Sequence, residues 1–430
     1  MKVLFVYPRF QRHAEAHPEL LDYVPMNEYL GSPSLGIAMI AASTPDHVEL
    51  EFRDDRLHDA GIPTDADIVA MSFFTPAATR ALELADYFKG QGKIVVAGGI
   101  FPTMMPDVVQ RHVDSVFVGE GEGAWRRFLK DHANGEIKPR YHAEDVALGE
   151  LPDPRLDLYF DQECDRFMPD DYPLQISRGC ALSCHACVLP TSMTRKLRCF
   201  SLEQNIRQLE QLAARGRKGC LTEDTSWFPG HKGKRALEAL LDYIIESGTR
   251  ASISYIGISL PMILCTPVSF FDKAKRAGVD MFYLVGGFDP ITMNAFTGKD
   301  PKAYKRGIDA IQKAWDVGIE PYTSFLLGGD QDDLGTVDRM LEFADVSGIR
   351  KAEFAIATPY PGTPQWHKLV SEDRILHRDW SRYNDANVTF RPAQMTADEL
   401  QDGYLRLWRE FYRGRQHLGD LDKGERTIQF

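Results

Sequence analysis

Three closely spaced cysteines are the residues of this sequence best suited to chemistry. Cys180, Cys184 and Cys187 follow the pattern C-x3-C-x2-C within the stretch QISRGCALSCHACVLP. Thiolates are the preferred ligands of iron–sulfur clusters, and one compact loop can bring three of them to the same cluster. A cluster with three protein thiolates leaves one iron open to another ligand. The spacing therefore indicates a [4Fe–4S] site, and the preceding Arg178 and Gly179 suit a tight turn with partial charge balance.

A zinc site is the main alternative interpretation of the same cysteines. His185 would supply the fourth ligand, because three cysteines and one histidine are a known ligand set of structural zinc. The chain has seven cysteines, and neither a secretory leader nor an apolar run of about 18 residues is recognisable. We therefore expect a cytoplasmic protein outside the membrane, in which cysteines serve as metal ligands or buried thiols rather than disulfides.

The composition is that of a folded globular protein. The 430 residues are 43% hydrophobic and 26% charged, with a net charge of −12. This length allows two or three domains, and the composition gives no reason to expect disorder. A nucleic-acid partner is not expected, because the acidic balance offers no basic surface to neutralise phosphates.

The elements that must position the cysteines begin with an alternation of short apolar runs and helical segments over residues 1–145. In ATRALELADYFKG, apolar residues at helical spacing form one stripe, which Gly90 and Gly92 end. Strands without polar alternation, separated by helices, indicate a parallel sheet covered on both faces. We expect a doubly wound, Rossmann-like domain with roughly five strands. The expected strands are 2–7, 48–52, 68–72, 93–97 and 115–118.

A second series of strands and helices follows a Pro- and Asp-rich linker over residues 146–171. Parallel strands with right-handed crossovers predict a partial (βα)6 TIM-like barrel over residues 172–375, with its chemistry at the carboxyl ends of the strands. Residues 376–430, which include TADELQDGYLRLWREFYR, are expected to form a helical extension. The expected barrel strands are 174–177, 219–222, 252–256, 281–285, 322–327 and 352–356.

A C-x3-C-x2-C loop after the first strand of a partial barrel resembles the radical S-adenosylmethionine (SAM) superfamily. The strings DIVAMSFFTPAATRALELAD, VVAGGIFPTMMPD, FVGEGEGAW and ATPYPGTP resemble its cobalamin (B12)-binding-domain subfamily, over roughly residues 1–415. In that superfamily the open iron chelates SAM, and an electron from the reduced cluster breaks a carbon–sulfur bond. The resemblance implies three cofactors, namely a [4Fe–4S] cluster, SAM and cobalamin.

The resemblance also implies site residues beyond the cysteines. Glu223 and Asp224 end the second barrel strand, where they would face the amino group of SAM, and Asp289 follows the fourth strand, where it would face the ribose. Tyr360, after the sixth strand, would be a further catalytic residue that faces adenine or the substrate. A cobalamin tail would lie at the carboxyl ends of three strands of the first domain. The residues expected there are Ser72, Thr75, Gly98, Gly99, Gly119, Glu120 and Gly121.

The chain departs from its relatives at several positions. The D-x-H-x-x-G motif, whose histidine ligates cobalt in some cobalamin proteins, is missing, and Arg9, Arg12 and His13 are the candidates to face a ligand after the first strand. Relatives often read G-G-x-H-P-T where this chain has Phe101 in place of the histidine, and Ala186 stands where they carry an aromatic residue.

The leading hypothesis is a radical SAM enzyme, most simply a cobalamin-dependent methyltransferase or a related radical transformation in natural-product or secondary metabolism. It would act on a small molecule and take electrons from an external flavodoxin- or ferredoxin-type donor. Two alternatives stay open: a cobalamin-independent enzyme that transfers a 3-amino-3-carboxypropyl group to a nucleophile or metalloid, and a zinc-stabilised binding module without catalysis. Five residues are expected to line a partly polar barrel interior: Tyr255, Ser259, Tyr322, Ser324 and Glu353.

Overall fold

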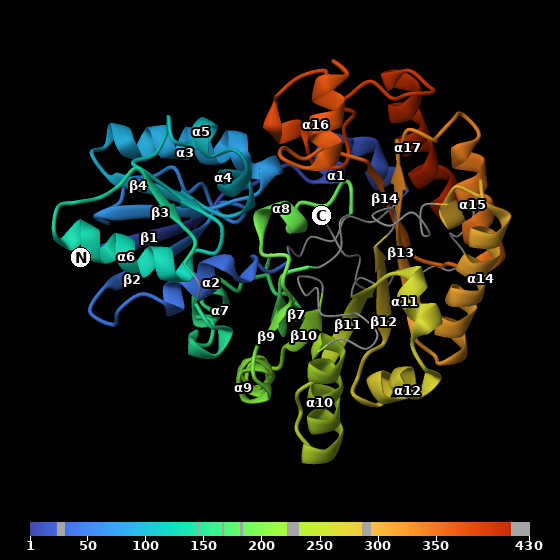
Figure 1. Cartoon of the computed structure of the whole chain (residues 1–430), viewed down its shortest axis with the longest axis horizontal. Coiled ribbons are helices and arrows are strands. Elements are labelled where there is room, and N and C mark those ends of the chain that lie inside the picture. The colour runs from blue at the N-terminus through green and yellow to red at the C-terminus, as the bar shows by residue number, and fades with distance from the viewer. Residues whose placement is uncertain are drawn as a thin grey trace.

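Two separate parallel sheets organise the chain (Figure 1). The structure is a computed structural model, and it describes residues 1–23, 31–144, 146–165, 167–180, 184–221, 232–285 and 294–413. Each sheet has six strands and its own buried core.

The first sheet is doubly wound, as the sequence predicts. Its strand order is β2-β1-β3-β4-β5-β6, and all its pairings are parallel. Along β1, Val3 and Phe5 pack against α2 and α6, whereas Leu4 and Val6 pack against α3 on the opposite face (Figure 1). The strands are β1 Lys2–Tyr7, β2 Glu49–Asp54, β3 Ile68–Ser72, β4 Ile94–Gly98, β5 Ser115–Val118 and β6 Arg140–His142.

The helices of this part of the chain are short, apart from those that cover the sheet. The sixth strand, β6, was not predicted, because it has only three residues, two of them polar, and it pairs at the edge with β5 alone. The helices are α1 His13–Ala16, η1 Pro18–Asp22, α2 Leu35–Ala42, η2 Thr75–Ala77, α3 Ala78–Gly90, α4 Ile100–Met104, α5 Pro106–Val109, α6 Glu122–Ala133, η3 Leu148–Glu150 and α7 Asp157–Phe160.

The second sheet is an open, partial barrel. Its order, β14-β13-β12-β11-β10-β7, follows the chain, and every pairing is parallel. In this arrangement the carboxyl ends of neighbouring strands meet at one rim, where barrel enzymes carry their chemistry. The strands are β7 Asp171–Pro173, β10 Lys218–Leu221, β11 Ile253–Ile258, β12 Met281–Val285, β13 Glu320–Leu327 and β14 Ala352–Ile356.

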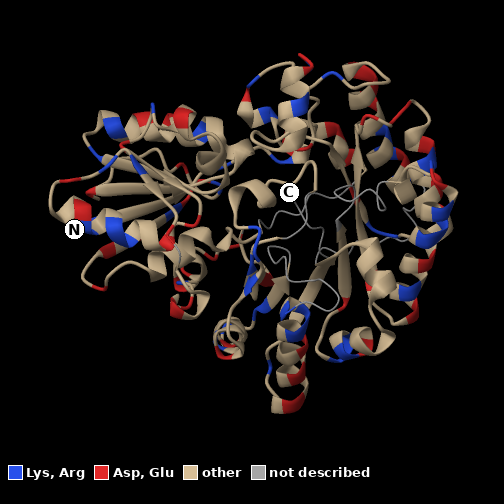
Figure 2. Ribbon diagram, in the orientation of Figure 1, with Lys and Arg blue, Asp and Glu red and all other residues tan. Residues whose placement is uncertain are grey.

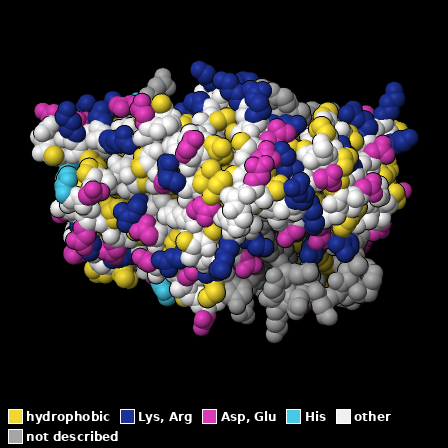
Figure 3. All heavy atoms as spheres, turned by 90° about the horizontal axis from the view of Figure 1, so that it is seen from below, with side chains coloured by type: hydrophobic (Ala, Val, Ile, Leu, Met, Phe, Trp, Pro, Cys, Tyr) yellow, Lys and Arg dark blue, Asp and Glu magenta, His cyan; other side chains and the backbone are white. Residues whose placement is uncertain are grey.

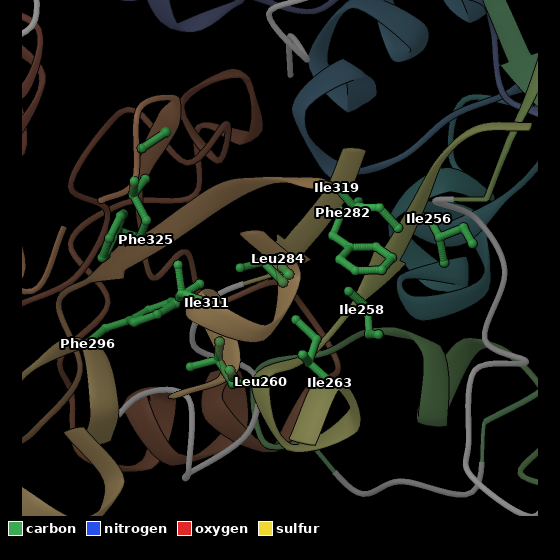
Figure 4. Close-up of a cluster of buried hydrophobic side chains, with 14 of the residues drawn as sticks. Ile256, Ile258, Leu260, Ile263, Phe282, Leu284, Phe296, Ile311, Ile319 and Phe325 are labelled. Carbon is green, nitrogen blue, oxygen red and sulfur yellow. The ribbon is translucent and has the colours of Figure 1, made fainter. Parts of the chain in front are cut away.

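Helices cover the outer face of this sheet and bury its apolar side chains. Figure 4 shows Ile256, Ile258, Phe282 and Leu284 from the strands beside Ile311 from a covering helix. The covering helices are α9 Leu202–Ala213, α10 Lys232–Ser247, α11 Leu260–Cys265, α12 Val268–Arg276, α14 Pro301–Asp316 and α15 Thr336–Ser347.

The prediction for the first barrel strand is wrong. The strand is Asp171–Pro173, not 174–177. Leu174 and Ile176 follow the strand and are fully buried in the core, and the Leu174 amide still donates to the Cys220 carbonyl of β10 at 2.8 Å, so this stretch resembles a strand in sequence. Ser177 instead belongs to a separate short strand, β8 (Ser177–Arg178), which pairs with β9 (Arg198–Cys199).

The C-terminal extension covers the free edge of β14. The hydroxyl of Tyr412, in α17 (Ala397–Arg413), donates to the Ala352 carbonyl at 2.5 Å, and the Ile356 amide donates to the Asp385 carbonyl at 2.6 Å. An uncovered edge strand would offer unpaired backbone groups to other chains. The extension therefore completes the barrel where its strands end.

An aromatic cluster joins the extension to the first domain. Phe101 of α4 is fully buried, and its ring lies 5.3 Å from that of Trp380 in η4 (Trp380–Arg382). Trp380 also contacts Trp366, in α16 (Pro364–Ser371), and Tyr383. Phe101, which replaces a histidine of the relatives, thus serves as a packing residue between two parts of the chain.

The surface carries both signs of charge. Lys and Arg alternate with Asp and Glu along the outer helices in Figure 2, and both signs are spread over the face in Figure 3. None of the helices that the structure describes is long and apolar enough to cross a membrane.

Truncation of the central ring of the aromatic cluster should destabilise the fold. We expect Trp380→Ala to lower the free energy of unfolding by about 3–5 kcal/mol, because it leaves a cavity among three aromatic rings. Leu376→Ala, in the same segment but exposed, should change it by less than about 0.5 kcal/mol. Urea unfolding followed by circular dichroism measures both, and equal midpoints for the two variants would contradict the packing role.

Candidate active site

A two-stranded ribbon brackets the cysteine loop. The antiparallel strands β8 and β9 pair Ser177 with Cys199 and Arg178 with Arg198, so residues 179–197 form a loop closed at its base. Gly179 has a φ of +92°, and a Cβ there would collide with the carbonyl oxygens of Thr194 and Lys196. Glycine is therefore required where the chain turns into the first cysteine.

The three thiols of the loop are partly shielded from solvent. Cys180 is buried, with 8% of its surface exposed, whereas Cys184 and Cys187 are half-buried, and none of them forms a disulfide. Burial raises the pKa of the Cys187 thiol, and the neighbouring Cys180 adds to this effect. Two of the predicted ligands therefore lie close enough to interact electrostatically.

The donor set fits an iron–sulfur cluster by its chemistry. Three thiols on one loop are the ligands that such a cluster takes, and bound metal would favour their thiolate form. Among the residues that the structure describes, no three His, Cys, Asp or Glu side chains are already grouped as a metal site. His185, the fourth ligand of the zinc alternative, has an exposed side chain, and its carbonyl accepts from the Gln365 amide at 3.1 Å.

The loop lies at the junction of the two sheets. Its helix α8 (Leu189–Ser192), directly after Cys187, packs against α4 of the first domain. The Gln365 contact ties the same loop to α16. The loop thus lies beside α4, which follows a strand of the first sheet, and beside α16; Figure 1 shows α8 between these two helices.

Acidic residues of the first domain hold the base of the loop. The Arg178 guanidinium pairs with Glu120 at 3.2 Å and with Glu122 at 2.7 Å, and Arg198 also pairs with Glu120. Glu120 was predicted to contact cobalamin, but its carboxylate is engaged by these two arginines. The sequence showed Arg178 as a source of charge balance, whereas its partners on the first domain became apparent only in the fold.

The other residues predicted to face cobalamin converge on the C-terminal edge of the first sheet. Ser72 pairs in register with Gly98, at the ends of β3 and β4, and both are half-buried. Thr75 is buried at the start of η2, and the Gly119 amide, after β5, donates to Thr103 Oγ1 at 3.0 Å. The accessible hydroxyl and glycine backbone fit a nucleotide-like tail at this edge.

Packing within the protein explains part of this glycine pattern. A Cβ at Gly99 would collide with the Phe73 backbone and the Ser72 hydroxyl, and one at Gly121 with Ile40. These glycines are required whether or not a ligand is bound. Their assignment to cobalamin, like that of Ser72, Thr75, Gly98 and Gly119, stays a prediction.

The candidates after the first strand are all engaged by other residues of the chain. His13 lies against the C-terminal extension, where its Nδ1 is 2.9 Å from the Tyr404 hydroxyl, and burial lowers its pKa to about 4. Arg12 pairs with Glu15 of the same short helix, and the Arg9 amide donates to Asp55.

The inner face of the barrel is aromatic and acidic. Cys220, Tyr255, Met281, Tyr283 and Tyr322 form a buried cluster there. The Tyr283 hydroxyl donates to Glu353 Oε1 at 2.5 Å, and burial raises the pKa of Glu353 to about 7. Four of the residues predicted to line the barrel, Tyr255, Tyr322, Ser324 and Glu353, are buried in the sheet, and Ser259 follows β11 as the N-cap of α11.

A second carboxylate lies at the rim. Asp385, from the extension, accepts a hydrogen bond from the Tyr360 hydroxyl at 2.7 Å, and burial raises its pKa to about 6. Tyr360, predicted as catalytic, thus directs its hydroxyl to Asp385. Sequence reasoning missed Asp385 and Tyr283, because neither belongs to a motif or has a distinctive spacing.

The similarity to known proteins extends over most of the chain. Residues 30–129 match the family model of the B12 binding domain. Over 398 residues the chain is 25% identical to bacteriochlorophyllide d C-12(1)-methyltransferase of Chlorobaculum tepidum, which spans 89% of this chain and 83% of that protein. Hopanoid C-2 methylase of Rhodopseudomonas palustris is 23% identical, over 90% of this chain and 73% of its own length.

A solved structure shares the arrangement of the two sheets. The radical SAM methyltransferase TsrM from Kitasatospora setae, with cobalamin and a [4Fe–4S] cluster bound, has a TM-score of 0.61 at 15% identity, covering 86% of this chain and 78% of that chain. The chain thus shares the fold of this radical SAM methyltransferase, and its first part matches the B12 binding domain.

The remaining assignments for a radical SAM enzyme fall on residues that the structure does not describe. Glu223, Asp224 and Asp289, predicted to contact SAM, lie outside the described residues. Their roles stay predictions of the family resemblance.

The buried Glu353 should make the stability of the chain depend on pH. Its folded pKa, about 7, exceeds its ordinary value of 4.5, so its contribution is fully present below pH 4.5 and is lost as the pH rises through 7. Glutamine does not titrate, so Glu353→Gln lacks this loss. Relative to the wild type, the free energy of unfolding of the variant should therefore rise by up to about 3 kcal/mol between pH 5 and 8. Urea unfolding at a series of pH values measures the difference. For Glu342→Gln, a change at an exposed residue, the curve of unfolding free energy against pH should run parallel to that of the wild type. A parallel curve for Glu353→Gln as well would contradict the raised pKa of Glu353.

Proposed function

We propose that the chain is a cobalamin-dependent radical SAM methyltransferase that acts on a small molecule. The observation that carries the proposal is the position of the Cys180, Cys184 and Cys187 loop, held between a B12-binding domain and the rim of a partial barrel. Two cofactors that exchange groups with one substrate need such a junction, because catalysis requires the reacting groups to be held side by side.

The residues of the chain would divide the work between the two sheets. Cys180, Cys184 and Cys187 would hold the cluster, and the edge near Ser72 and Gly98 would hold cobalamin. When bound, the cluster supplies one-electron cleavage of SAM at its open iron, and cobalamin supplies a carrier for the methyl group.

The barrel interior would receive the substrate. Tyr255, Tyr283 and Tyr322 provide an aromatic surface, and Glu353 provides a group that accepts hydrogen bonds. The relatives named as a bacteriochlorophyllide methyltransferase and a hopanoid methylase support methyl transfer to a small molecule. An external flavodoxin- or ferredoxin-type donor in the cytoplasm would deliver the electron.

Product analysis tests this function. The anaerobic chain, reconstituted with iron, sulfide and hydroxocobalamin and given SAM and a reductant, should form S-adenosylhomocysteine and 5′-deoxyadenosine, measured by mass spectrometry. The variant Cys187→Ser should form neither, because it removes a cluster ligand. Cys265→Ser, an exposed cysteine of α11, is the matched control and should retain both products.

Two outcomes would contradict the proposal. 5′-Methylthioadenosine as the main product would indicate transfer of a 3-amino-3-carboxypropyl group. Zinc in place of iron in the reconstituted chain, with SAM unchanged, would indicate a zinc-stabilised binding module.

A further inference from the structure

The base of the cysteine loop carries a set of four charges, two of them buried, which we call the Arg178 bridge. It consists of Arg178 and Arg198 on the loop side and Glu120 and Glu122 on the side of the first domain. Arg178 and Glu122 are each 6% exposed. Two positive and two negative groups balance, as buried charges must if their desolvation is to be offset.

The arginines hold both ends of the loop at once. Arg178 and Arg198 are partners in the β8–β9 register, and both pair with Glu120. Gln175 Oε1 accepts from Arg178 Nε at 2.8 Å, and the guanidinium lies 5.7 Å from the Phe200 ring. These contacts fix the planar group from several directions, and Cys180 follows only two residues later.

The glutamates belong to the turn between β5 and α6, where a ligand of the first sheet would lie. Neighbours hold this turn firmly: Gly119 donates to Thr103 and packs on Ala143, and Gly121 packs on Ile40. The same four-residue turn therefore offers its backbone to the C-terminal edge of the sheet and its carboxylates to the cysteine loop. A shift of the turn must displace the arginines, and a shift of the loop must displace the turn.

We propose that Arg178 and Arg198 are positioning residues that couple ligand binding at the edge of the first sheet to cluster binding in the cysteine loop. The identity of the two ligands rests on the proposed function. A cluster that orders the loop also fixes the Glu120 and Glu122 side chains through the bridge, so ligand binding at the edge no longer carries the entropic cost of fixing them. Thermodynamic linkage makes the effect reciprocal, and such couplings change affinity by about 5- to 150-fold.

Hydroxocobalamin is the probe for this coupling. Its dissociation constant is measured anaerobically by absorbance titration of the full chain, once with the cluster and once after removal of iron by a chelator. For the wild type we expect tighter binding with the cluster, by about fivefold or more. In Glu122→Gln, which removes one charge at constant shape, the ratio of the two constants should fall towards one while the iron content is kept.

Two further variants separate positioning from simple loss of structure. Arg178→Lys keeps the charge but removes the planar guanidinium, whose two terminal nitrogens reach the two glutamates. This variant should lose most of the coupling yet remain folded. Asp153→Asn breaks the more exposed pair with Arg207 and should leave the ratio at the wild-type value. The paramagnetic resonance spectrum of the reduced cluster should change in Glu122→Gln and Arg178→Lys but not in Asp153→Asn.

The failures of the two proposals are distinguishable. A wild-type ratio of one, or a Glu122→Gln variant with full iron content and an unchanged ratio, overturns the coupling and leaves the proposed function standing. A wild-type chain that takes up no iron, or no hydroxocobalamin in either state, overturns the proposed function and the coupling with it.

Discussion

The position of the cysteine loop depends on one charged contact across the two sheets. Arg178 precedes the first cysteine, and its guanidinium is buried between Glu120 and Glu122 of the first domain. Removing one partner of a buried ion pair destabilises a protein strongly, because the remaining buried charge is left without a counter-charge. The loop is therefore fixed relative to the first sheet by electrostatics, and relative to α16 by the contact between His185 and Gln365.

The C-terminal extension gives the barrel its final wall. The backbone of Asp385 pairs with the free edge of β14, and its carboxylate receives the Tyr360 hydroxyl. Asp385 has a φ of 62°, in the left-handed region that aspartate adopts more readily than most non-glycine residues, and its contacts with Ile356 and Tyr360 stabilise it there. Its carboxylate and that of Glu353 interact, and burial keeps both pKa values raised.

The sequence predicted the fold well where apolar runs are long and fully buried. The doubly wound sheet, the open barrel and the loop with Cys180, Cys184 and Cys187 all follow from local pattern. The prediction for the first barrel strand was wrong, because Asp171–Pro173 is only three residues long and contains Asp and Pro, which are rare inside strands, whereas its buried neighbours resemble a strand more closely. Glu122, Arg198 and Asp385 were out of reach, because their partners are distant in the sequence: 78 residues separate Arg198 from Glu120, and 25 separate Asp385 from Tyr360.

The account depends on three thiolates that hold an iron cluster with one open iron. Paramagnetic resonance of the reduced, reconstituted chain before and after addition of SAM tests this claim most directly. We predict about four irons per chain and a cluster signal whose g-values shift when SAM is added, because SAM binds the open iron. A chain that binds zinc instead of iron, or a cluster signal that SAM leaves unchanged, would contradict the account.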